Sequence, residues 1–251
     1  MIMKKSIKWL SGIAIGVLLL GLVAFKYLDV PKPDTVATPE ADELALQMFE
    51  AINKAAWDTT HYVGWTFRDN RHFVWDKFAQ KVQVQWEDYK VVIHTDRPEG
   101  RAFQNGAELK DEAQRNAVDK AWSLFCNDSF WLNAPAKAFD PGTKRSLVDL
   151  EEGGTGLMVE YSSGGVTPGD SYLWILDENY LPKAWRMWVS IMPVGGVETS
   201  WESWTTISTG AKLAEKHIFQ GNSNTLIISN IRGGATLASI GVEKDPFKIL
   251  D

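Results

Sequence analysis

The clearest pattern in this sequence is an alternation of large apolar residues with small or polar ones between His61 and Thr95. It runs from Tyr62 to Arg68 and again from Val82 to Trp86. A period of two is typical of β-strands with one buried face. Turn-forming residues interrupt the stretch at Asp69-Asn70 and Ala79-Gln80. The stretch therefore predicts an antiparallel meander whose buried face is rich in indole.

Further strands are predicted in the second half of the chain, where short apolar runs alternate with turns such as Gly164-Gly165 and Gly195-Gly196. This regular spacing is typical of an antiparallel sheet or barrel, and no βαβ units indicate a parallel sheet. The predicted strands are Leu157–Tyr161, Tyr172–Leu176, Lys183–Ile191, Glu198–Ile207 and Thr225–Ile231.

Two helices are predicted from apolar residues that repeat at three and four positions. The first begins at Thr38-Pro39-Glu40, where a hydroxyl residue precedes a proline and an acidic first turn, and it continues to Ala56. The second covers Lys110 to Phe125, and the aromatic segment Phe130 to Pro135 after it is expected to be irregular. The fold class is therefore mainly β with two or three helices (α+β), built on a curved antiparallel sheet.

The chain begins with lysines and then an uncharged apolar run from Trp9 to Phe25. No small-x-small cleavage site follows this run, which favours a membrane-spanning anchor over the alternative, a cleaved signal peptide. Because the lysines lie on its N-terminal side, the positive-inside rule places the chain after Lys26 outside the cytoplasm. We therefore predict a single-pass protein of the inner membrane with its C-terminal domain in the periplasm or another extracytoplasmic space.

The chain divides into three parts on this interpretation. Residues 1–26 form the cytoplasmic stub and transmembrane signal-anchor. Residues 27–39, with two prolines and no periodicity, are expected to be an extended, unpacked linker. Residues 40–251 form a single β-rich domain.

Composition narrows the function. The formal net charge is −6 and no basic run is interleaved with aromatic residues, so we expect no nucleic-acid partner. The single cysteine, Cys126, excludes an intramolecular disulfide. The 12 tryptophans indicate either a large solid β core or a cavity lined by aromatic side chains.

The order of elements resembles the lipoprotein-carrier family of LolA and LolB. The resemblance is carried by the predicted helix that leads into the strand at His61, by Tyr172–Asp177, and by Tyr180–Lys183 with the returning Trp185–Met187. Members of that family are half-open antiparallel barrels with helices over the open side and an apolar cavity for acyl chains. The resemblance implies a lipid or a lipoprotein acyl chain as partner. Arg71–Asp76 is also similar to a segment of an uncharacterised group of exported bacterial proteins.

Signals for catalysis are weak. Gly169–Leu173 is similar to the nucleophile block of GDSL esterases, but it opens a mid-chain strand, and His217 is preceded by Ala214 where that family has an aspartate. His72 and Asp76 are four residues apart on one strand, a spacing that suits an acid–base pair or a structural pair. The histidines lack metal-binding spacing. We expect no enzyme activity, no metal and no cofactor.

The sequence thus predicts a membrane-tethered binding protein for a lipid or other apolar ligand. Two alternatives stay open: an envelope protein–protein interaction domain with a solid core, and a hydrolase. Because one face of each strand in a curved sheet lines its concave side, the candidate ligand-binding residues are Trp65, Phe67, Val84, Trp86, and either Trp185 with Met187 or its neighbour Trp188. Neither the ligand nor the oligomeric state is specified.

Overall fold

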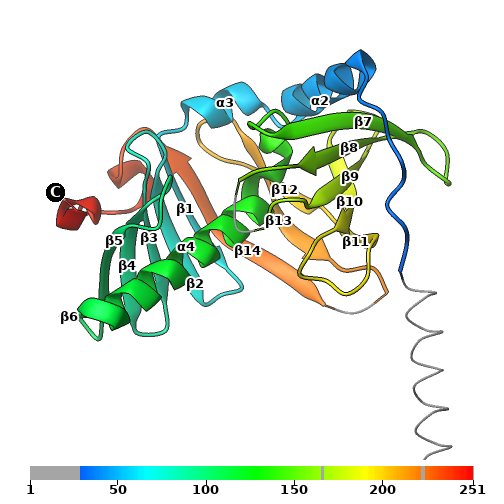
Figure 1. Ribbon diagram of the computed structural model, residues 1–251. Coiled ribbons are helices and arrows are strands. Elements are labelled where there is room, and N and C mark those ends of the chain that lie inside the picture. Colours follow the sequence, from blue (N-terminus) through cyan, green and yellow to red (C-terminus); the bar gives the residue numbers. More distant parts are fainter. Residues whose placement is uncertain (1–28, 165–166, 222–223, 251) are drawn as a thin grey trace, which may run out of the picture.

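Two antiparallel sheets form the body of the protein in a computed structural model that describes residues 29–164, 167–221 and 224–250 (Figure 1). The larger sheet consists, in spatial order, of β12 (Glu202–Thr206), β13 (Lys212–Ile218), β14 (Thr225–Gly234), β1 (Tyr62–Phe67), β2 (Arg71–Asp76), β3 (Lys81–Trp86), β4 (Tyr89–His94), β5 (Gly100–Gln104) and β6 (Ala107–Glu108). The smaller sheet consists of β11 (Val197–Ser200), β10 (Pro182–Trp188), β9 (Ser171–Leu176), β8 (Thr155–Tyr161) and β7 (Thr143–Asp149). The mainly β, α+β architecture with curved antiparallel sheets is thus confirmed.

The predicted meander is present. Strands β1 to β4 pair in sequence order, with Trp65 opposite Phe73 and Val84 opposite both Phe73 and Val91. The turn between β1 and β2 needs two residues in the left-handed conformation, Arg68 at φ 51 and Asp69 at φ 59. Aspartate tolerates this conformation, which suits a tight hairpin turn.

The two sheets are joined by one interrupted strand. The prediction of a continuous strand over Glu198–Ile207 is wrong, because β11 pairs with β10 whereas β12 pairs with β13. The change of sheet occurs at Trp201, whose side chain is buried among Trp174, Trp185 and His217. Burying this indole between the sheets gives a physical reason for the break.

Besides the two-residue β6, two strands of the structure are absent from the sequence prediction. Strand β7 lies at the edge of the smaller sheet and is rich in charged residues, so its burial alternates poorly. Strand β13 carries four charged or titratable residues in seven and presents a weak period of two. The apolar pattern is weak in both strands because each buries only part of its length.

The helices differ from their predicted bounds. The first helix is broken into α2 (Pro39–Ala51) and α3 (Lys54–Thr59), because Asn53 adopts a left-handed conformation at φ 53 and its amide donates to the carbonyl oxygen of Gly210 at 3.0 Å. The second helix, α4 (Asp111–Asn133), continues through most of the aromatic segment expected to be irregular. A short 3-10 helix, η1 (Ala134–Lys137), follows it.

Each sheet has its own apolar core. Helix α4 packs on the larger sheet, where Ala121 and Phe125 join Val63, Trp65 and Val84. Helix α2 packs on the smaller sheet, where its buried residues meet the indoles of that sheet, in a cluster that includes Ala41, Ala45, Met48, Trp174, Trp185 and Trp201. Trp131 on α4 packs against both clusters, so the end of this helix lies where the two cores meet.

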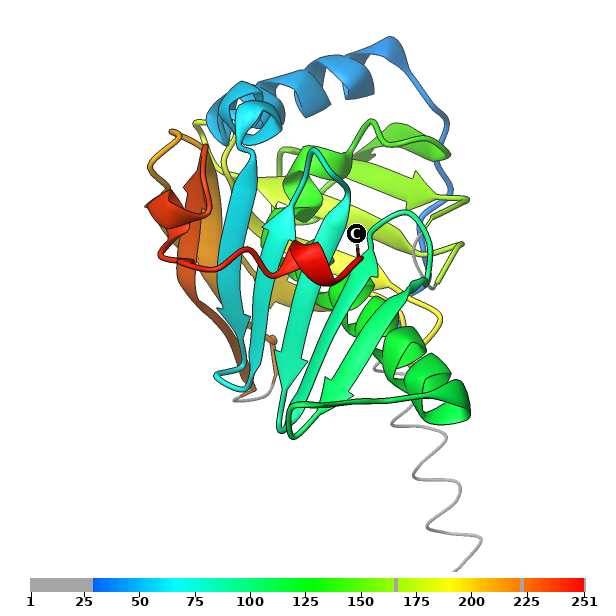
Figure 2. The ribbon, with the colours of Figure 1, turned by 90° about the vertical axis from the view of Figure 1, so that its left-hand side faces the viewer.

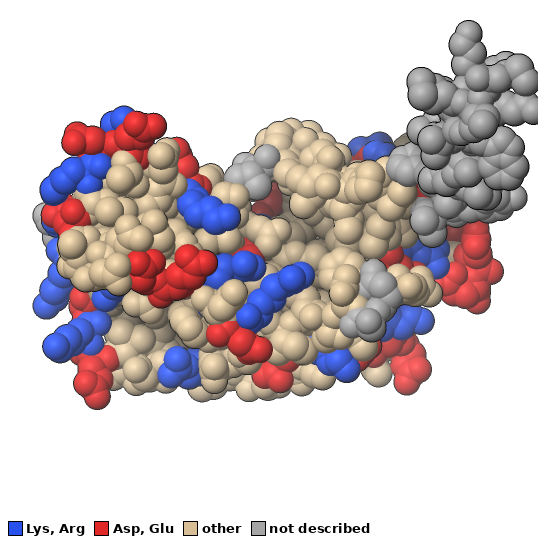
Figure 3. All heavy atoms as spheres, turned by 90° about the horizontal axis from the view of Figure 1, so that it is seen from below, with Lys and Arg blue, Asp and Glu red and all other residues tan. Residues whose placement is uncertain are grey.

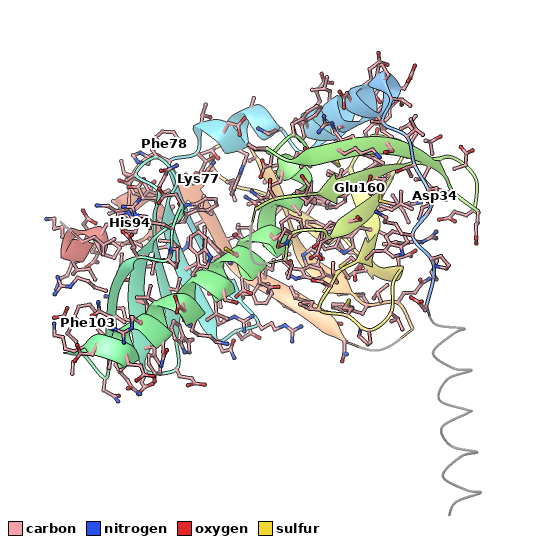
Figure 4. All side chains as sticks on the ribbon, viewed as in Figure 1. Asp34, Lys77, Phe78, His94, Phe103 and Glu160 are labelled. Carbon is pink, nitrogen blue, oxygen red and sulfur yellow. The ribbon has the colours of Figure 1, made fainter. Side chains whose placement is uncertain are left out.

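The N-terminal segment 29–38 is extended but is packed, in contrast to the unpacked linker expected. Its Lys32 ammonium forms an ion pair with Glu160, and Ala37 forms an isolated bridge with Ser146 of β7. Figure 4 shows Glu160 beside this segment, in which Asp34 is labelled. Prolines favour the extended conformation and cannot donate from the main chain, so side chains supply several of the contacts.

The C-terminal segment crosses the outer face of the larger sheet (Figure 2). Two short helices, η2 (Ala238–Ile240) and η3 (Phe247–Leu250), place Ile240 and Phe247 in buried positions. Ile240 lies 3.7 Å from the position that a Cβ atom would take at Gly64 of β1. Strand β1 is therefore covered on both faces.

The predicted transmembrane segment lies outside the described residues. None of the helices within the described ranges has the length and apolar character needed to cross a bilayer. The anchor therefore stays a prediction from the sequence.

Candidate ligand-binding cavity

A cavity of about 880 Å³ lies where the two sheets and the second half of α4 meet. Figure 3 shows that the molecule is hollowed on the face seen from below. Its lining comes from β1, β2, α4, η1 and the loop after it, β8, β9 and the connection between them, β10 and the loop that follows it, the β13–β14 loop and β14. The lining residues include Phe67, Arg68, Arg71, Ser123, Cys126, Asn127, Asp128, Ser129, Phe130, Trp131, Asn133, Lys137, Asp140, Pro141, Tyr161, Ser163, Gly164, Asp170, Tyr172, Trp185, Met187, Val189, Ile191, Met192, Phe219 and Leu226.

Aromatic side chains form much of the inner wall. The ring of Trp185 on β10 lies 4.6 Å from Tyr172 on β9, 4.9 Å from Trp131 and 5.9 Å from Phe130, measured between ring centroids. Phe219 lies 5.8 Å from Trp131. These rings come from both sheets and from α4, so the wall is apolar on several sides at once. Such a wall suits an apolar ligand.

One ion pair is built into the wall. The guanidinium of Arg71 donates to the two carboxylate oxygens of Asp128 at 2.6 and 3.1 Å. The Asp128 side chain is fully buried, and Asn127 donates to it at 2.7 Å. Burial raises the pKa of the Asp128 carboxyl, while the bonds from Asn127 and Arg71 oppose this rise. The pair joins β2 to α4 across the cavity wall.

A second carboxylate has a structural role. Asp170, just before β9, is buried and accepts a hydrogen bond from the main-chain N–H of Ser190 at 2.9 Å. Burial raises the pKa of the Tyr172 hydroxyl, and the neighbouring Asp170 raises it further. Tyr172 therefore stays a neutral donor. Asp170 fastens the loop after β10 to the start of β9.

The single cysteine faces the cavity. Cys126 on α4 is partly buried among the lining residues. Burial raises the pKa of its thiol to about 11, so the thiol is protonated at neutral pH. A protonated thiol behaves as a small apolar group in the wall.

The structure separates the predicted ligand-binding residues into two groups. Phe67, Trp185 and Met187 line the cavity. The other four do not belong to its lining. Trp65 and Val84 lie in the apolar core of the larger sheet, and the ring of Trp86 stacks on that of Tyr89 with 5.0 Å between the ring centroids. The indole N–H of Trp188 donates a hydrogen bond to the carbonyl oxygen of Val30. Both members of the pair Trp185 and Met187 therefore face inward, while their neighbour Trp188 faces the N-terminal segment.

The candidate catalytic residues do not converge. His72 contacts the Thr66 hydroxyl at 3.0 Å, whereas Asp76 contacts His61 at 3.1 Å. His217 is buried between Trp131 and Trp201, outside the cavity lining, and burial lowers its pKa to about 4. Within the described residues, no histidine lines the cavity and no three metal-ligating side chains lie together.

Several lining residues are not predicted by the sequence pattern. Phe130 and Trp131 belong to the aromatic segment expected to be irregular, whereas the structure places both on α4. Continuing the three-and-four repeat of α4 past Phe125, through Leu132, would have placed them on the helix. Arg71 and Asp128 are 57 residues apart and carry no local pattern that links them.

No protein-family model matches this chain, and no curated protein matches it. Among solved structures it is similar to a DUF1329 family protein from Desulfovibrio piger, with a TM-score of 0.43, 8% identity, and coverage of 86% of this chain and 100% of that one. It is also similar to a LolA superfamily protein from Nitrosomonas europaea, with a TM-score of 0.35, 9% identity, and coverage of 81% and 97%. A third similar structure is a domain from Vibrio parahaemolyticus provisionally assigned to outer membrane lipoprotein sorting, with a TM-score of 0.39, 8% identity, and coverage of 80% and 97%.

The LolA superfamily is thus among the structures to which the chain is similar. None of these TM-scores reaches 0.5.

Proposed function

We propose that this protein is a membrane-tethered, extracytoplasmic binding protein that holds a lipid or another acyl-bearing ligand in the cavity between its two sheets. The observation that carries this proposal is the cavity of about 880 Å³, which lies in the range of roughly 300–1,000 Å³ typical of ligand pockets. A solid core would not leave such a space, because protein interiors are close-packed.

The chemistry of the wall favours a long apolar group. Rings from α4, β9 and β10 surround the space, and Met187 adds a flexible apolar side chain. The carboxylates in the lining are engaged with Arg71, with a main-chain N–H, or, for Asp140, with Lys137 at 2.6 Å. The carboxylates of the wall are therefore satisfied by the protein itself, and the acyl part of a ligand has apolar surface to cover.

The tether comes from the sequence. The uncharged run from Trp9 to Phe25 is long enough to cross most of a bilayer, and the lysines before it favour a cytoplasmic N-terminus. A tethered domain acts on ligands that reach it at the membrane. Binding or receiving a lipid fits this position better than carrying one between membranes.

Cross-linking with a photoreactive fatty acid tests the proposal. The full-length protein in phospholipid vesicles is irradiated with the probe, and the modified peptides are mapped by mass spectrometry. We expect modification of α4 and β10 around Cys126 and Met187. Modification confined to the exposed surface would instead favour the envelope interaction protein.

Two substitutions sharpen this test. Met187→Trp fills part of the cavity and should reduce cross-linking, whereas Leu46→Trp adds the same ring at an exposed position on α2 and should leave it unchanged. Ser129→Leu is a second, smaller obstruction of the cavity, for use should Met187→Trp prevent folding. Equal labelling in all variants would contradict binding in the cavity.

A hydrolase is the remaining alternative. The one cysteine in the cavity has a raised pKa and no histidine beside it in the described lining. Incubating the protein with an ester of the same fatty acid tests this alternative. Release of the free acid above the rate without protein would support a hydrolase.

A further inference from the structure

The mouth of the cavity can be located from the exposure of its lining. Most lining residues are buried or half-buried, but some are exposed and therefore lie where the cavity opens. They come from the β1–β2 turn, α4, the loop after η1, the β8–β9 connection and the loop after β10: Arg68, Ser123, Asn127, Pro141, Ser163, Gly164 and Ile191. Ile191 is the most exposed large apolar side chain among them, at 74%.

The loop that carries Ile191 is apolar and uncharged. It runs from Val189 to Gly196 with the sequence VSIMPVGG. Val189, Ile191 and Met192 line the cavity, and Ile191 also projects into solvent. An exposed isoleucine at the rim of a cavity costs solvation free energy unless a partner covers it.

The start of the described chain is fastened to this same loop. The indole N–H of Trp188 donates to the carbonyl oxygen of Val30 at 2.7 Å, and the N–H of Gly195 donates to the Asp29 carboxylate at 2.8 Å. The N–H of Val30 in turn donates to the carbonyl oxygen of Gly195 at 3.2 Å. These three bonds hold the beginning of the domain against the rim.

The contact depends on a glycine. A Cβ atom at Gly196 would lie 2.5 Å from the Cβ atom of Val30, and the residue has φ 72. A side chain here would therefore both push Val30 away and strain the backbone. The close approach of segment and loop is a built feature of the fold.

Chain length then sets how far the rim can lie from the apolar run. Only Lys26, Tyr27 and Leu28 separate Phe25 from Asp29. Four residue steps span at most about 14 Å even when fully extended. A run that crosses the bilayer up to Phe25 therefore brings the cavity rim to the membrane surface.

We propose that the loop from Val189 to Gly196 docks on the phospholipid bilayer, so that the cavity opens directly onto the membrane. This inference rests on the proposed tether and adds an orientation to it. Ile191 enters the interfacial region, where apolar side chains are favoured. Arg68, at the same rim, is exposed, and its positive charge helps to lower the pKa of the Asp128 carboxyl. At a docked rim this guanidinium would also attract lipid phosphates.

Site-specific fluorescence in vesicles tests the docking. In the full-length protein with Cys126→Ser, an environment-sensitive fluorophore is attached to Ile191→Cys or, as a control, to Phe78→Cys. Phe78 is 60% exposed, and Figure 4 shows it on the opposite side of the domain from Asp34 and the N-terminal segment. Vesicles of phosphatidylethanolamine and phosphatidylglycerol carry a nitroxide-labelled lipid as quencher.

We expect blue-shifted emission at position 191 and quenching several times that at position 78. Equal, weak quenching at both positions overturns the docking, and equal, strong quenching overturns the orientation. Alkaline carbonate extraction distinguishes failure of the docking from failure of the tether. Release of the protein by carbonate would overturn the tether and, with it, the docking. A protein that stays in the membrane but has an unquenched label at position 191 would overturn the docking alone.

Discussion

Arg71 and Asp128 form a two-point ion pair that connects strand β2 to helix α4 in the wall of the cavity. The carboxylate is fully buried, and the guanidinium also lies 4.7 Å above the ring of Phe67. A buried charge that loses its partner is strongly destabilising. This relationship couples the stability of the domain to the geometry of the cavity.

Replacing Arg71 with leucine should therefore lower the free energy of unfolding by about 3–5 kcal/mol, because Asp128 would stay buried without its cation. Arg97→Leu is the matched control, since the ion pairs of Arg97 with Asp96 and Glu99 are exposed to solvent and screened, so their loss should change stability little. Urea unfolding followed by tryptophan fluorescence measures both. Similar losses in the two variants would show that the buried pair has no special weight.

The indoles of the meander should differ in their contribution to stability. Trp65 is 2% exposed and stacks on Phe73 at 4.4 Å, so Trp65→Ala should cost about 3–5 kcal/mol. Trp86 is only partly buried, and Trp86→Ala should cost less. Because neither ring lines the cavity, we expect folded molecules of both variants to keep their affinity for a fluorescent fatty acid. A specific loss of affinity in either variant would place that ring at the ligand.

The buried histidine predicts a pH dependence of stability. Burial lowers the pKa of His217 from 6.5 to about 4, so the unfolded state binds the extra proton more readily. The free energy of unfolding therefore carries the full contribution of neutral His217 above pH 6.5. This contribution, roughly 3 kcal/mol, is lost as the pH falls from 6.5 toward 4. The experiment is a series of urea titrations between pH 7 and pH 4.

His217→Asn is the matched variant, because its amide can keep the bond that His217 makes to the carbonyl oxygen of Ser200 at 3.2 Å. We expect this variant to be less stable at pH 7 but to lose less stability on acidification. An unchanged pH profile would assign the dependence to other groups.

Cys126 provides a reporter on cavity occupancy, because it is the single cysteine of the chain. With its pKa raised from 9.0 to about 11, its alkylation by iodoacetamide at pH 8 should be roughly 100-fold slower in the folded protein than in urea. A bound fatty acid should slow the reaction further. Mass spectrometry over time gives both rates, and a ligand that leaves the rate unchanged would contradict occupancy beside this thiol.

The sequence predicted the parts of the fold that have strong local patterns. Strands β1 and β3 follow the alternating pattern, turn residues mark the ends of the hairpins, and Pro39 marks the start of α2. The break at Trp201 could not be predicted, because an indole in a strand pattern suits a continuous strand equally well. The strand changes sheets at Trp201 because its ring packs against Trp174 on β9 of the smaller sheet and His217 on β13 of the larger sheet. Neither contact is visible in the local sequence.

The cavity was harder to predict than the sheet. Alternation indicates that Trp65 and Phe67 share a face, but only Phe67 lines the cavity, whereas Trp65 packs against Phe73 and Trp75 in the core. Which of the two borders the cavity depends on how distant elements pack, and no local pattern specifies that. Trp185 and Trp188 could not be distinguished either, since the choice depends on the contact between Trp188 and Val30.

The outer strand β7 has a consequence for how this protein behaves at high concentration. Its unpaired side would offer a template on which other chains could add strands. The bridge from Ala37 to Ser146 and the bond from Lys144 to the carbonyl oxygen of Thr35 cover part of that edge, and charged residues occupy several of its positions. Removing residues 29–38 would uncover this edge, so a domain cut between Thr38 and Pro39 should aggregate at a lower protein concentration than the intact chain.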